Sequence, residues 1–286
     1  MIADKDSSFP EKFVDAGKGK IFYRFNQRHV GCPVIVFLHG LSANHTTWLT
    51  MMKTFEAIGY NSLSPDMRGH GLSDKTRKRK LYNMKVFADD LRDIIQKEKI
   101  GEHIIVGYSY GGEIALEYAG RRPRNLKALV VISTNCVSPL KYKKINFLTP
   151  VIYAVLNFLS VILIWQSRKK YHYYRQGKSR GYWHSVWIGL NTMPLSVNFW
   201  MLSQMGLINF KKALARIKVP TLIIRGKKDP FVSKAEAEDM AAMIPDAELI
   251  TFDNPSHFIG SRSQDELTEE ILKFLRRRKM DNTSKI

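Results

Sequence analysis

Cysteine is almost absent from the 286-residue sequence, which contains only Cys32 and Cys136. These two positions are too far apart to form a metal-ligand motif, and a single pair does not make a disulfide framework, so a reducing compartment is favoured. The first residues, MIADKDSSFPEKF, lack the apolar core of a secretory signal, and we therefore expect a cytoplasmic protein. Internal repeats and low-complexity linkers are also missing, and the length suits one large domain or one domain with an insertion.

Acidic residues are missing from one long stretch, residues 141–218. This stretch carries 13 Lys or Arg and four of the five tryptophans of the chain, whose formal net charge is +19. A basic protein can meet nucleic acid, an anionic membrane or acidic small molecules. Zinc-finger spacings and RNP-like aromatic motifs do not occur. Nucleic acid would therefore depend on charge alone and is disfavoured as a partner.

Strand-like and helix-like segments alternate along most of the chain. Continuous apolar runs such as PVIVFLHG (33–40) are typical of buried parallel strands. The alternation predicts an α/β fold with a mostly parallel central sheet and helices on both faces. Residues 139–216 contain no run that fits the sheet, so we interpret them as an inserted helical cap on a core of residues 1–138 and 217–286. The expected strands are 20–25, 33–40, 61–66, 103–108, 126–133, 219–226 and 247–253, with a hairpin around Gly17 and Gly19, and the expected helices are 47–58, 85–99, 113–121, 234–243 and 265–278.

The run GYSYGG (107–112) places Ser109 between glycines, on a sharp turn from an expected strand to an expected helix. Gly107 and Gly111 leave room for a strained backbone because they carry no Cβ atom. The Ser109 hydroxyl would stand clear at the carboxyl edge of the sheet, where the N-terminus of the next helix favours developing negative charge. A glycine-rich turn with a capping serine is the plain alternative, but the strand before the motif and the helix after it favour a nucleophile.

A neutral serine needs a base, and the base needs a carboxylate that orients it. Asp229 directly follows the expected strand 219–226, and His257 follows the strand 247–253. Each has an ordinary interpretation on its own, Asp229 as a turn aspartate before proline and His257 as a loop histidine that caps a helix. Their order after Ser109, each behind its own strand, favours a triad of these three residues.

An oxyanion formed at the serine would need two N–H donors. We predict the amide of Tyr110, directly after the nucleophile, and the amide of Leu41, in the loop after the strand 33–40. His39 precedes this second donor and is interpreted as structural rather than as a base.

The segment DMRGHGLSD (66–74) holds several polar side chains close together. We interpret it as a tight glycine-rich loop held by hydrogen bonds of Asp66 and Arg68, because no second cluster of ligands supports a metal site. The predicted chemistry requires neither a metal nor an organic cofactor.

Taken together, these motifs resemble those of the α/β-hydrolase fold superfamily. They are HG at 39–40, DxRGxGxS at 66–73, GxSxGG at 107–112, GxxDPxV at 226–232 and a late histidine, His257. The resemblance covers nearly the whole chain outside the cap and is nearest to cap-bearing esterases and monoacylglycerol-lipase-like serine hydrolases. Relatives that open epoxides or remove halides usually have an aspartate nucleophile, so serine at position 109 argues against them. Many lipase-like relatives have His and Met or Gln beside the serine, where this chain has Tyr108 and Tyr110.

Within the predicted cap, the segment FLTPVIYAVLNFLSVILIW (147–165) contains no charged residue. Thr149 is expected as its N-cap and Pro150 as its first helical residue. Thr149, Tyr153, Asn157 and Ser160 form a thin polar stripe on an otherwise apolar helix. A membrane crossing here would separate the serine from the rest of the triad. Two alternatives therefore stay open: a cap helix that dips into a membrane surface, and a buried cap helix with a solvated basic face.

The sequence thus predicts a serine hydrolase that cleaves carboxylic esters with an apolar acyl chain, monoacylglycerol or lysolipid-like, through an acyl-enzyme. The acid-free segment disfavours an aminopeptidase, which would hold a terminal ammonium with carboxylates. Two further alternatives are a C–C bond hydrolase with the same triad, and a non-hydrolytic ligand receptor or membrane-associated scaffold on this fold. The expected partners are a small-molecule ester or lipid substrate and an anionic membrane surface, where the cytoplasmic protein would be peripheral.

Overall fold

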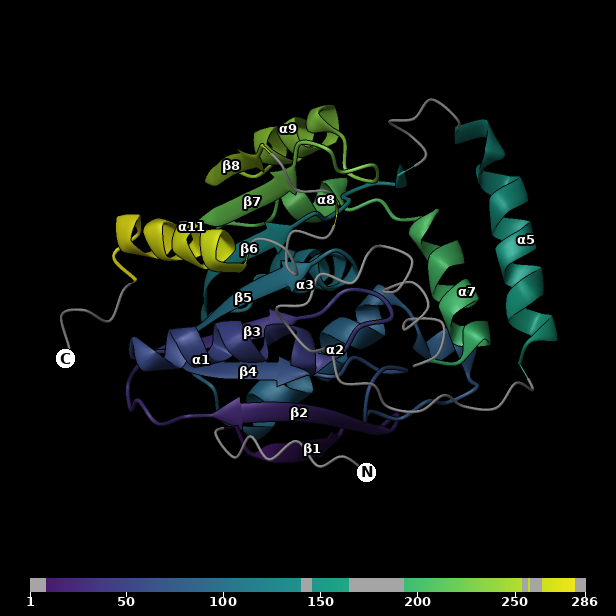
Figure 1. Ribbon diagram of the computed structural model, residues 1–286. Coiled ribbons are helices and arrows are strands. Elements are labelled where there is room, and N and C mark those ends of the chain that lie inside the picture. The colour runs from purple at the N-terminus through teal and green to yellow at the C-terminus, as the bar shows by residue number, and fades with distance from the viewer. Residues whose placement is uncertain (1–8, 140–145, 165–192, 254–256, 258–263, 281–286) are drawn as a thin grey trace.

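One eight-stranded sheet organises the computed structural model, which describes residues 9–139, 146–164, 193–253, 257 and 264–280. The strand order is β1-β2-β4-β3-β5-β6-β7-β8 (Figure 1). β1 and β2 form the predicted hairpin and β2 is antiparallel to β4, whereas the remaining neighbours are parallel. The predicted mostly parallel α/β fold is therefore confirmed. The strands are β1 (Glu11–Asp15), β2 (Lys20–Asn26), β3 (Val34–Leu38), β4 (Asn61–Pro65), β5 (His103–Tyr108), β6 (Leu126–Ile132), β7 (Thr221–Gly226) and β8 (Ala247–Phe252).

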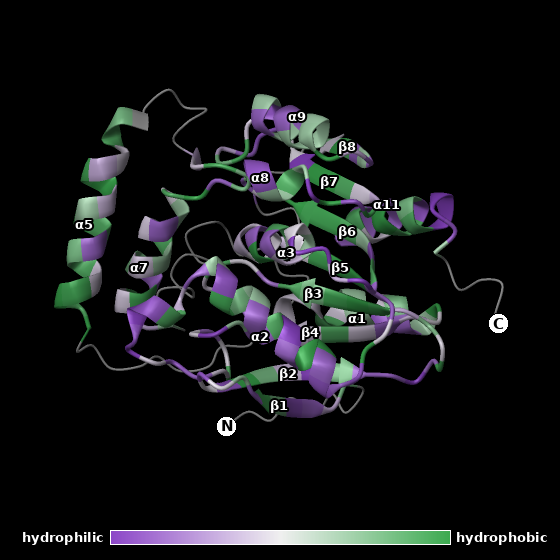
Figure 2. Ribbon diagram, turned by 180° about the vertical axis from the view of Figure 1, so that it is seen from behind, coloured by the Kyte–Doolittle hydropathy of each residue, from purple (hydrophilic) through white to green (hydrophobic). Residues whose placement is uncertain are grey.

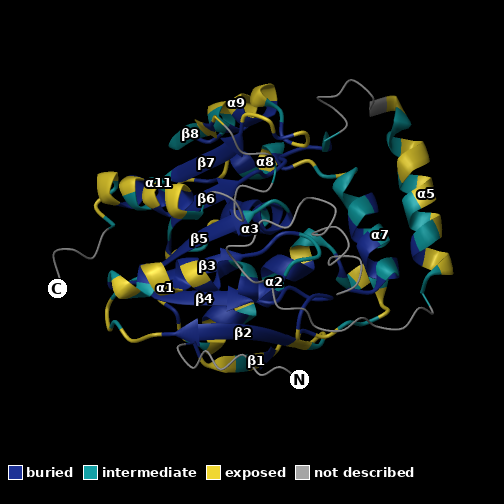
Figure 3. Ribbon diagram, viewed as in Figure 1, coloured by how far each residue is buried: buried dark blue, intermediate teal, exposed yellow. Residues whose placement is uncertain are grey.

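Alternate residues of the central strands enter two separate cores, as the two-residue period of a strand requires. On β3, Val36 packs in the core that includes α2 and α3, whereas Ile35 and Phe37 pack in the core that includes α1 and α11. Both faces of the sheet are thus buried under helices (Figure 3), which explains the continuous apolar runs of the strands. The helices against the sheet are α1 (Leu49–Ala57), α2 (Met84–Lys97), α3 (Tyr110–Gly120), α8 (Lys211–Leu214), α9 (Lys234–Met243) and α11 (Gln264–Arg277).

Two more helices stand beyond the carboxyl ends of the parallel strands. α5 (Thr149–Ile162) and α7 (Leu195–Met205) pack on each other, and α7 lies between α5 and the sheet (Figures 1 and 2). The chain leaves the core and returns to it at one place, since Val137 forms a β-bridge with Asn209. The bounds 139–216 of the cap remain a prediction, and α8, which falls inside them, packs on α3 and α9.

α5 differs from its prediction at its first turn and in its burial. Thr149 is the first helical residue and Leu148 is the N-cap, with no side-chain hydrogen bond, so the predicted N-cap role of Thr149 is wrong. The helix can begin before Pro150 because a residue of the first turn needs no N–H partner within the helix. Ser160 is the one buried residue of α5, so the alternative of a buried cap helix is wrong as well. None of the described helices is long and apolar enough to cross a membrane.

Candidate active site

The turn after β5 holds Ser109 in a strained backbone conformation. Its φ of 51° and ψ of −117° lie in a region that residues other than glycine rarely occupy. A Cβ atom on Gly107 would lie 2.6 Å from the carbonyl oxygen of Gly111, so the turn closes only with glycine there. α3 begins at Tyr110, earlier than the predicted residue 113, because the elbow leads into the helix without a linker. This is the geometry that presents a nucleophile at the top of a sheet.

The side chains of Ser109, His257 and Asp229 form one line of hydrogen bonds. Ser109 Oγ lies 3.0 Å from Nε2 of His257, and Nδ1 of His257 lies 2.9 Å from Oδ2 of Asp229. The carboxylate accepts from Nδ1–H, which leaves Nε2 as an acceptor for the serine hydroxyl. The structure therefore brings together the three residues that the sequence singles out, from loops after β5, β7 and β8.

The Asp229 carboxylate is fixed by more than the histidine. Its Oδ1 accepts hydrogen bonds from the amides of Phe231 at 2.8 Å and Val232 at 3.1 Å, and its side chain is fully buried. Burial alone would raise the pKa of Asp229, but the hydrogen bonds from His257 and these two amides outweigh it and hold the pKa below its ordinary value. The group is therefore an anion, as the predicted role of Asp229 in orienting His257 requires.

Two aromatic residues contact His257. The Tyr108 hydroxyl donates to the backbone carbonyl of His257 at 2.9 Å, and the two rings are 5.7 Å apart. The Phe231 ring meets His257 edge-on at 4.9 Å. The sequence marks Tyr108 as a departure from lipase-like relatives but does not reveal this role. Phe231 carries no signal except its place two residues after Asp229.

The two predicted oxyanion donors both have amides that are available for a ligand. Tyr110 is the first residue of α3, where the N–H has no acceptor inside the helix. Neither the Tyr110 amide nor the Leu41 amide bonds to another described residue. A Cβ atom on Gly40 would lie 3.6 Å from the Cβ atom of Ser109, so the loop that carries Leu41 passes next to Ser109.

Histidines tie the loop after β3 to the loop after β4. His39 donates through Nδ1 to the Gly40 carbonyl and accepts through Nε2 from the Met67 amide at 3.0 Å. His70 accepts in the same way from the Ser42 amide at 3.1 Å. Burial lowers the pKa of His39 to about 4 and that of His70 to about 3, so both rings are neutral at pH 7. They set the position of the Leu41 amide, which agrees with the structural interpretation of His39.

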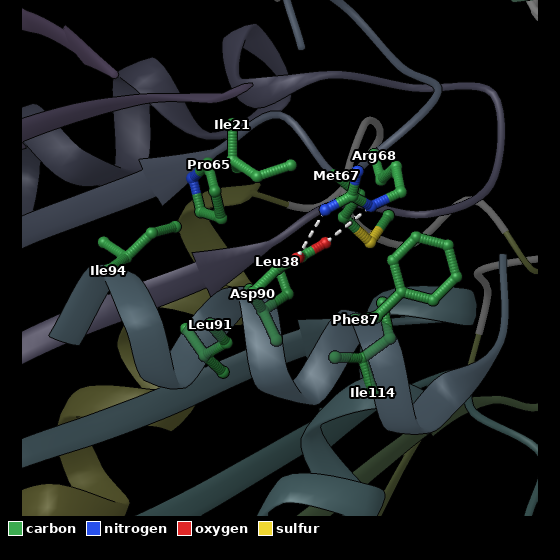
Figure 4. Close-up of a pocket in the computed structure, with 10 residues that line it drawn as sticks. All are labelled: Ile21, Leu38, Pro65, Met67, Arg68, Phe87, Asp90, Leu91, Ile94 and Ile114. Carbon is green, nitrogen blue, oxygen red and sulfur yellow. Dashed lines mark hydrogen bonds and ion pairs between the residues drawn. The ribbon is translucent and has the colours of Figure 1, made fainter. Parts of the chain in front are cut away.

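Asp66 and Arg68 hold the loop 66–74, as expected. Each of the two side chains bonds to a different residue outside the loop. Asp66 accepts from both the amide and Nδ1 of His45, at 2.7 and 2.8 Å. Arg68 makes a two-pronged ion pair with Asp90 of α2 (Figure 4). The cavity of about 20 Å³ beside this pair has room for no more than a water molecule, so it is not a substrate pocket. The described residues contain no group of three or more His, Cys, Asp and Glu able to hold a metal ion.

A carboxylate reaches the loop after β6 from an unexpected element. The sequence of that loop contains no acid, but Glu236 of α9 accepts from Asn135 Nδ2 and from the Cys136 amide, both at 3.0 Å. Ser233 caps α9 by accepting from the Glu236 amide. Sequence reasoning misses this contact, because the pattern S-x-x-E predicts that such a glutamate folds back on its own helix.

α7 and the residues just before it contact the loop that carries Leu41. Asn198 donates to the hydroxyl of Ser42, and Met193 and Val197 are buried in the same cluster against which Leu41 packs. A Cβ atom on Gly69 would lie 3.3 Å from Val197. The loop that carries Leu41 is therefore covered on the α7 side by apolar side chains and by the contact between Asn198 and Ser42.

Comparison with known proteins shows the family to which this chain belongs. The alpha/beta hydrolase fold family matches residues 33–261, so the chain belongs to this family and is related to hydrolases. The AB hydrolase superfamily protein YfhM of Bacillus subtilis is 24% identical over 262 residues, which cover 85% of this chain and 90% of that protein. The bifunctional esterase/perhydrolase DCH of Acinetobacter calcoaceticus is 26% identical over 258 residues, covering 85% of this chain and 92% of the relative.

Among solved structures, the fold is similar to that of a membrane phospholipase A described as a bacterial virulence factor. The TM-score is 0.73 at 19% identity, with 96% of this chain and 88% of the other chain covered. At this level of identity the likeness concerns the fold alone.

Proposed function

We propose that the protein is a serine hydrolase that cleaves carboxylic esters with an apolar acyl chain, monoacylglycerol or lysolipid-like. The observation that carries this proposal is the unbroken line of hydrogen bonds from Ser109 through His257 to Asp229. The same three residue types in this arrangement activate a serine hydroxyl on several unrelated folds.

Each step of the reaction has a residue in place. The hydroxyl oxygen of Ser109 attacks the ester carbonyl carbon while Nε2 of His257 takes the proton. The Leu41 and Tyr110 amides donate to the oxyanion, and the bond to the alcohol breaks as His257 returns the proton to it. Water then attacks the carbonyl carbon of the acyl-enzyme while His257 takes its proton. The bond to Ser109 breaks, His257 returns the proton to the serine oxygen, and the carboxylic acid product departs.

The apolar environment supports the choice of an apolar acyl chain. Leu41 packs against the large buried cluster that also contains Met193, Val197 and Met201 of the α7 region. An acyl chain that runs from the carbonyl toward this cluster would lose its contact with water. The esterase activity in the name of DCH is consistent with hydrolysis of a carboxylic ester.

The test combines an activity-based label with a panel of substrates. We expect a fluorophosphonate probe to label wild-type protein on Ser109 and not to label Ser109→Ala. We also expect kcat/KM for p-nitrophenyl esters to be higher for medium or long acyl chains than for acetate. Absence of labelling on Ser109 would favour the ligand-receptor alternative. Turnover of an anionic 1,5-diketone in preference to every ester would favour the C–C hydrolase.

A further inference from the structure

α5 presents apolar side chains to solvent and polar ones to the protein. Every exposed residue between positions 147 and 162 is apolar, and Phe147, Val151 and Phe158 are 75%, 59% and 64% exposed. A soluble helix normally shows the reverse pattern, with its apolar stripe toward the core. The outward position of α5 and its exposed surface are visible in Figures 1 and 3.

The exposed residues form a continuous face rather than scattered points. Val151, Val155, Phe158 and Ile162 follow each other at intervals of four, three and four residues, which places them on one side of a helix. Asn157 and Ser160, of the predicted polar stripe, lie on the opposite side and are turned inward. We name the surface formed by the exposed side chains of residues 147–162 the outer face of α5. Contiguous apolar surface of this kind marks an interaction site.

Arg79, which lies between β4 and α2, fixes this orientation of α5. The guanidinium of Arg79 donates to Oδ1 of Asn157 at 2.9 Å and to Oγ of Ser160 at 3.0 Å. The same group lies 5.0 Å from the centre of the Trp200 ring on α7. Because Arg79 satisfies the polar stripe from the protein side, the apolar side of α5 is held outward.

A basic run of the chain reaches α5 from the protein side, through Arg79. Arg79 belongs to the run KTRKRK (75–80), which contains no acid, and Lys78 and Lys80 on either side of it are exposed. The stretch 141–218, which includes α5, also carries 13 Lys or Arg and no acid. An apolar surface beside clustered cations matches the chemistry of an anionic lipid surface, which attracts the cations and accepts the apolar side chains.

We propose that the outer face of α5 docks on an anionic lipid surface, with Phe158 inserted and Lys78 and Lys80 over the headgroups. Charge argues against a second copy of the chain as the occupant, because two copies docked through α5 would also bring their basic runs 75–80 toward each other. α5 stands beyond the carboxyl edge of the sheet, where Ser109 also lies, so docking turns this edge toward the lipid (Figure 1). The proposal does not depend on catalysis.

Co-sedimentation of the whole protein with vesicles tests this proposal. Wild-type protein should bind vesicles of phosphatidylcholine with phosphatidylserine, and bind phosphatidylcholine alone much more weakly. Lys78→Ala combined with Lys80→Ala should lower the partition coefficient at low salt roughly thirtyfold. Phe158→Asp should lower it at least about tenfold and remove the fraction that persists at high salt. Val30→Asp, which adds the same charge at an exposed apolar residue of the loop between β2 and β3, should bind like wild type.

Two further measurements, of vesicle binding and of ester hydrolysis, distinguish failure of this proposal from failure of the proposed function. Ser109→Ala should bind vesicles like wild type, and Phe158→Asp should retain hydrolysis of p-nitrophenyl butyrate. The docking proposal would be overturned if wild-type protein failed to bind vesicles at low salt, or if Phe158→Asp and Val30→Asp bound equally well. Either result would leave the proposed hydrolase function unaffected. A wild-type dimer that dissociates in Phe158→Asp would also overturn it, because a second copy would then be the occupant.

Discussion

The hydroxyl oxygen of Ser109 lies 3.0 Å from Nε2 of His257, although the two residues are 148 positions apart in the chain. The sheet creates this contact, since β5 and β8 end at the same edge. Losing the nucleophile of a triad costs on the order of 10⁶ in kcat, because its members act as a unit. We therefore expect Ser109→Ala to abolish ester hydrolysis while the denaturation midpoint stays close to that of wild type. Activity within tenfold of wild type, with contaminating esterases excluded, would remove Ser109 from the role of nucleophile.

Asp229→Asn should lower kcat by roughly 10⁴, because an amide at this position favours the wrong tautomer of His257. The variant keeps an oxygen for the amides of Phe231 and Val232, so its loop should retain its shape. Asp253→Asn is a suitable control, since Asp253 directly follows the neighbouring strand β8 and is exposed. Steady-state kinetics on one ester compare the two variants. A nearly silent Asp229→Asn would mean that another acid, with Glu236 the first to examine, supports the histidine.

The fold and the three central residues could be predicted because they depend on local patterns. Each parallel strand is a continuous apolar run, and the residue after such a run must lie at the carboxyl edge. Ser109, Asp229 and His257 all follow runs of this kind. The three residues come together because their strands end at the same edge of the sheet. No pattern in the sequence shows their side-chain contacts directly.

Contacts between side chains of distant elements could not be predicted in this way. Glu236 reaches the loop after β6 from another helix, and the Tyr108 hydroxyl finds a backbone carbonyl in the loop after β8. The direction in which α5 faces depends on Arg79, which precedes that helix by about seventy residues in the sequence. Periodicity identifies two sides of a helix, but the partner that satisfies the polar side decides which one turns inward.

Tyr108→Phe removes the hydroxyl that holds the His257 backbone and leaves the ring in place. A net hydrogen bond of this kind contributes about 0.5–1.5 kcal/mol, so we expect kcat to fall up to about tenfold with little change in KM. The measurement is a comparison of both constants with those of Phe25→Leu, a core change far from the site. An unchanged kcat would show that the ring contacts with Tyr108 and Phe231 are sufficient to position His257.

We expect the buried Glu113 carboxyl to make the stability of the fold depend on pH. The residue is fully buried in α3, and neither carboxyl oxygen has a partner among the described residues. Burial raises the pKa of Glu113 well above its ordinary value, and the nearby Glu236 raises it further. In the folded protein Glu113 keeps a proton that it loses in the unfolded chain, where the pKa of a glutamate is about 4.3. The free energy of unfolding therefore falls as pH rises from the unfolded pKa toward the raised folded pKa.

Glu113→Gln should remove this dependence, because the amide does not titrate. The free energy of unfolding of wild type should decline relative to that of the variant by up to about 1.4 kcal/mol for each pH unit above the unfolded pKa. Urea titrations of both proteins at pH 5, 6, 7 and 8 give the comparison. Parallel curves would show that the Glu113 carboxyl titrates alike in the folded and unfolded states.

Arg79→Ala should release α5 without unfolding the sheet. Hydrogen bonds from a charged donor contribute about 1.5–3 kcal/mol, so amide exchange in α5 should accelerate roughly tenfold to a hundredfold. The two buried cores contain no residue of α5, and exchange in β3 and β5 should therefore keep its wild-type rate. Lys78→Ala, one position away on an exposed side chain, is the matched control and should leave α5 protected. Equal exchange in both variants would show that packing on α7, rather than Arg79, holds the apolar side of α5 outward.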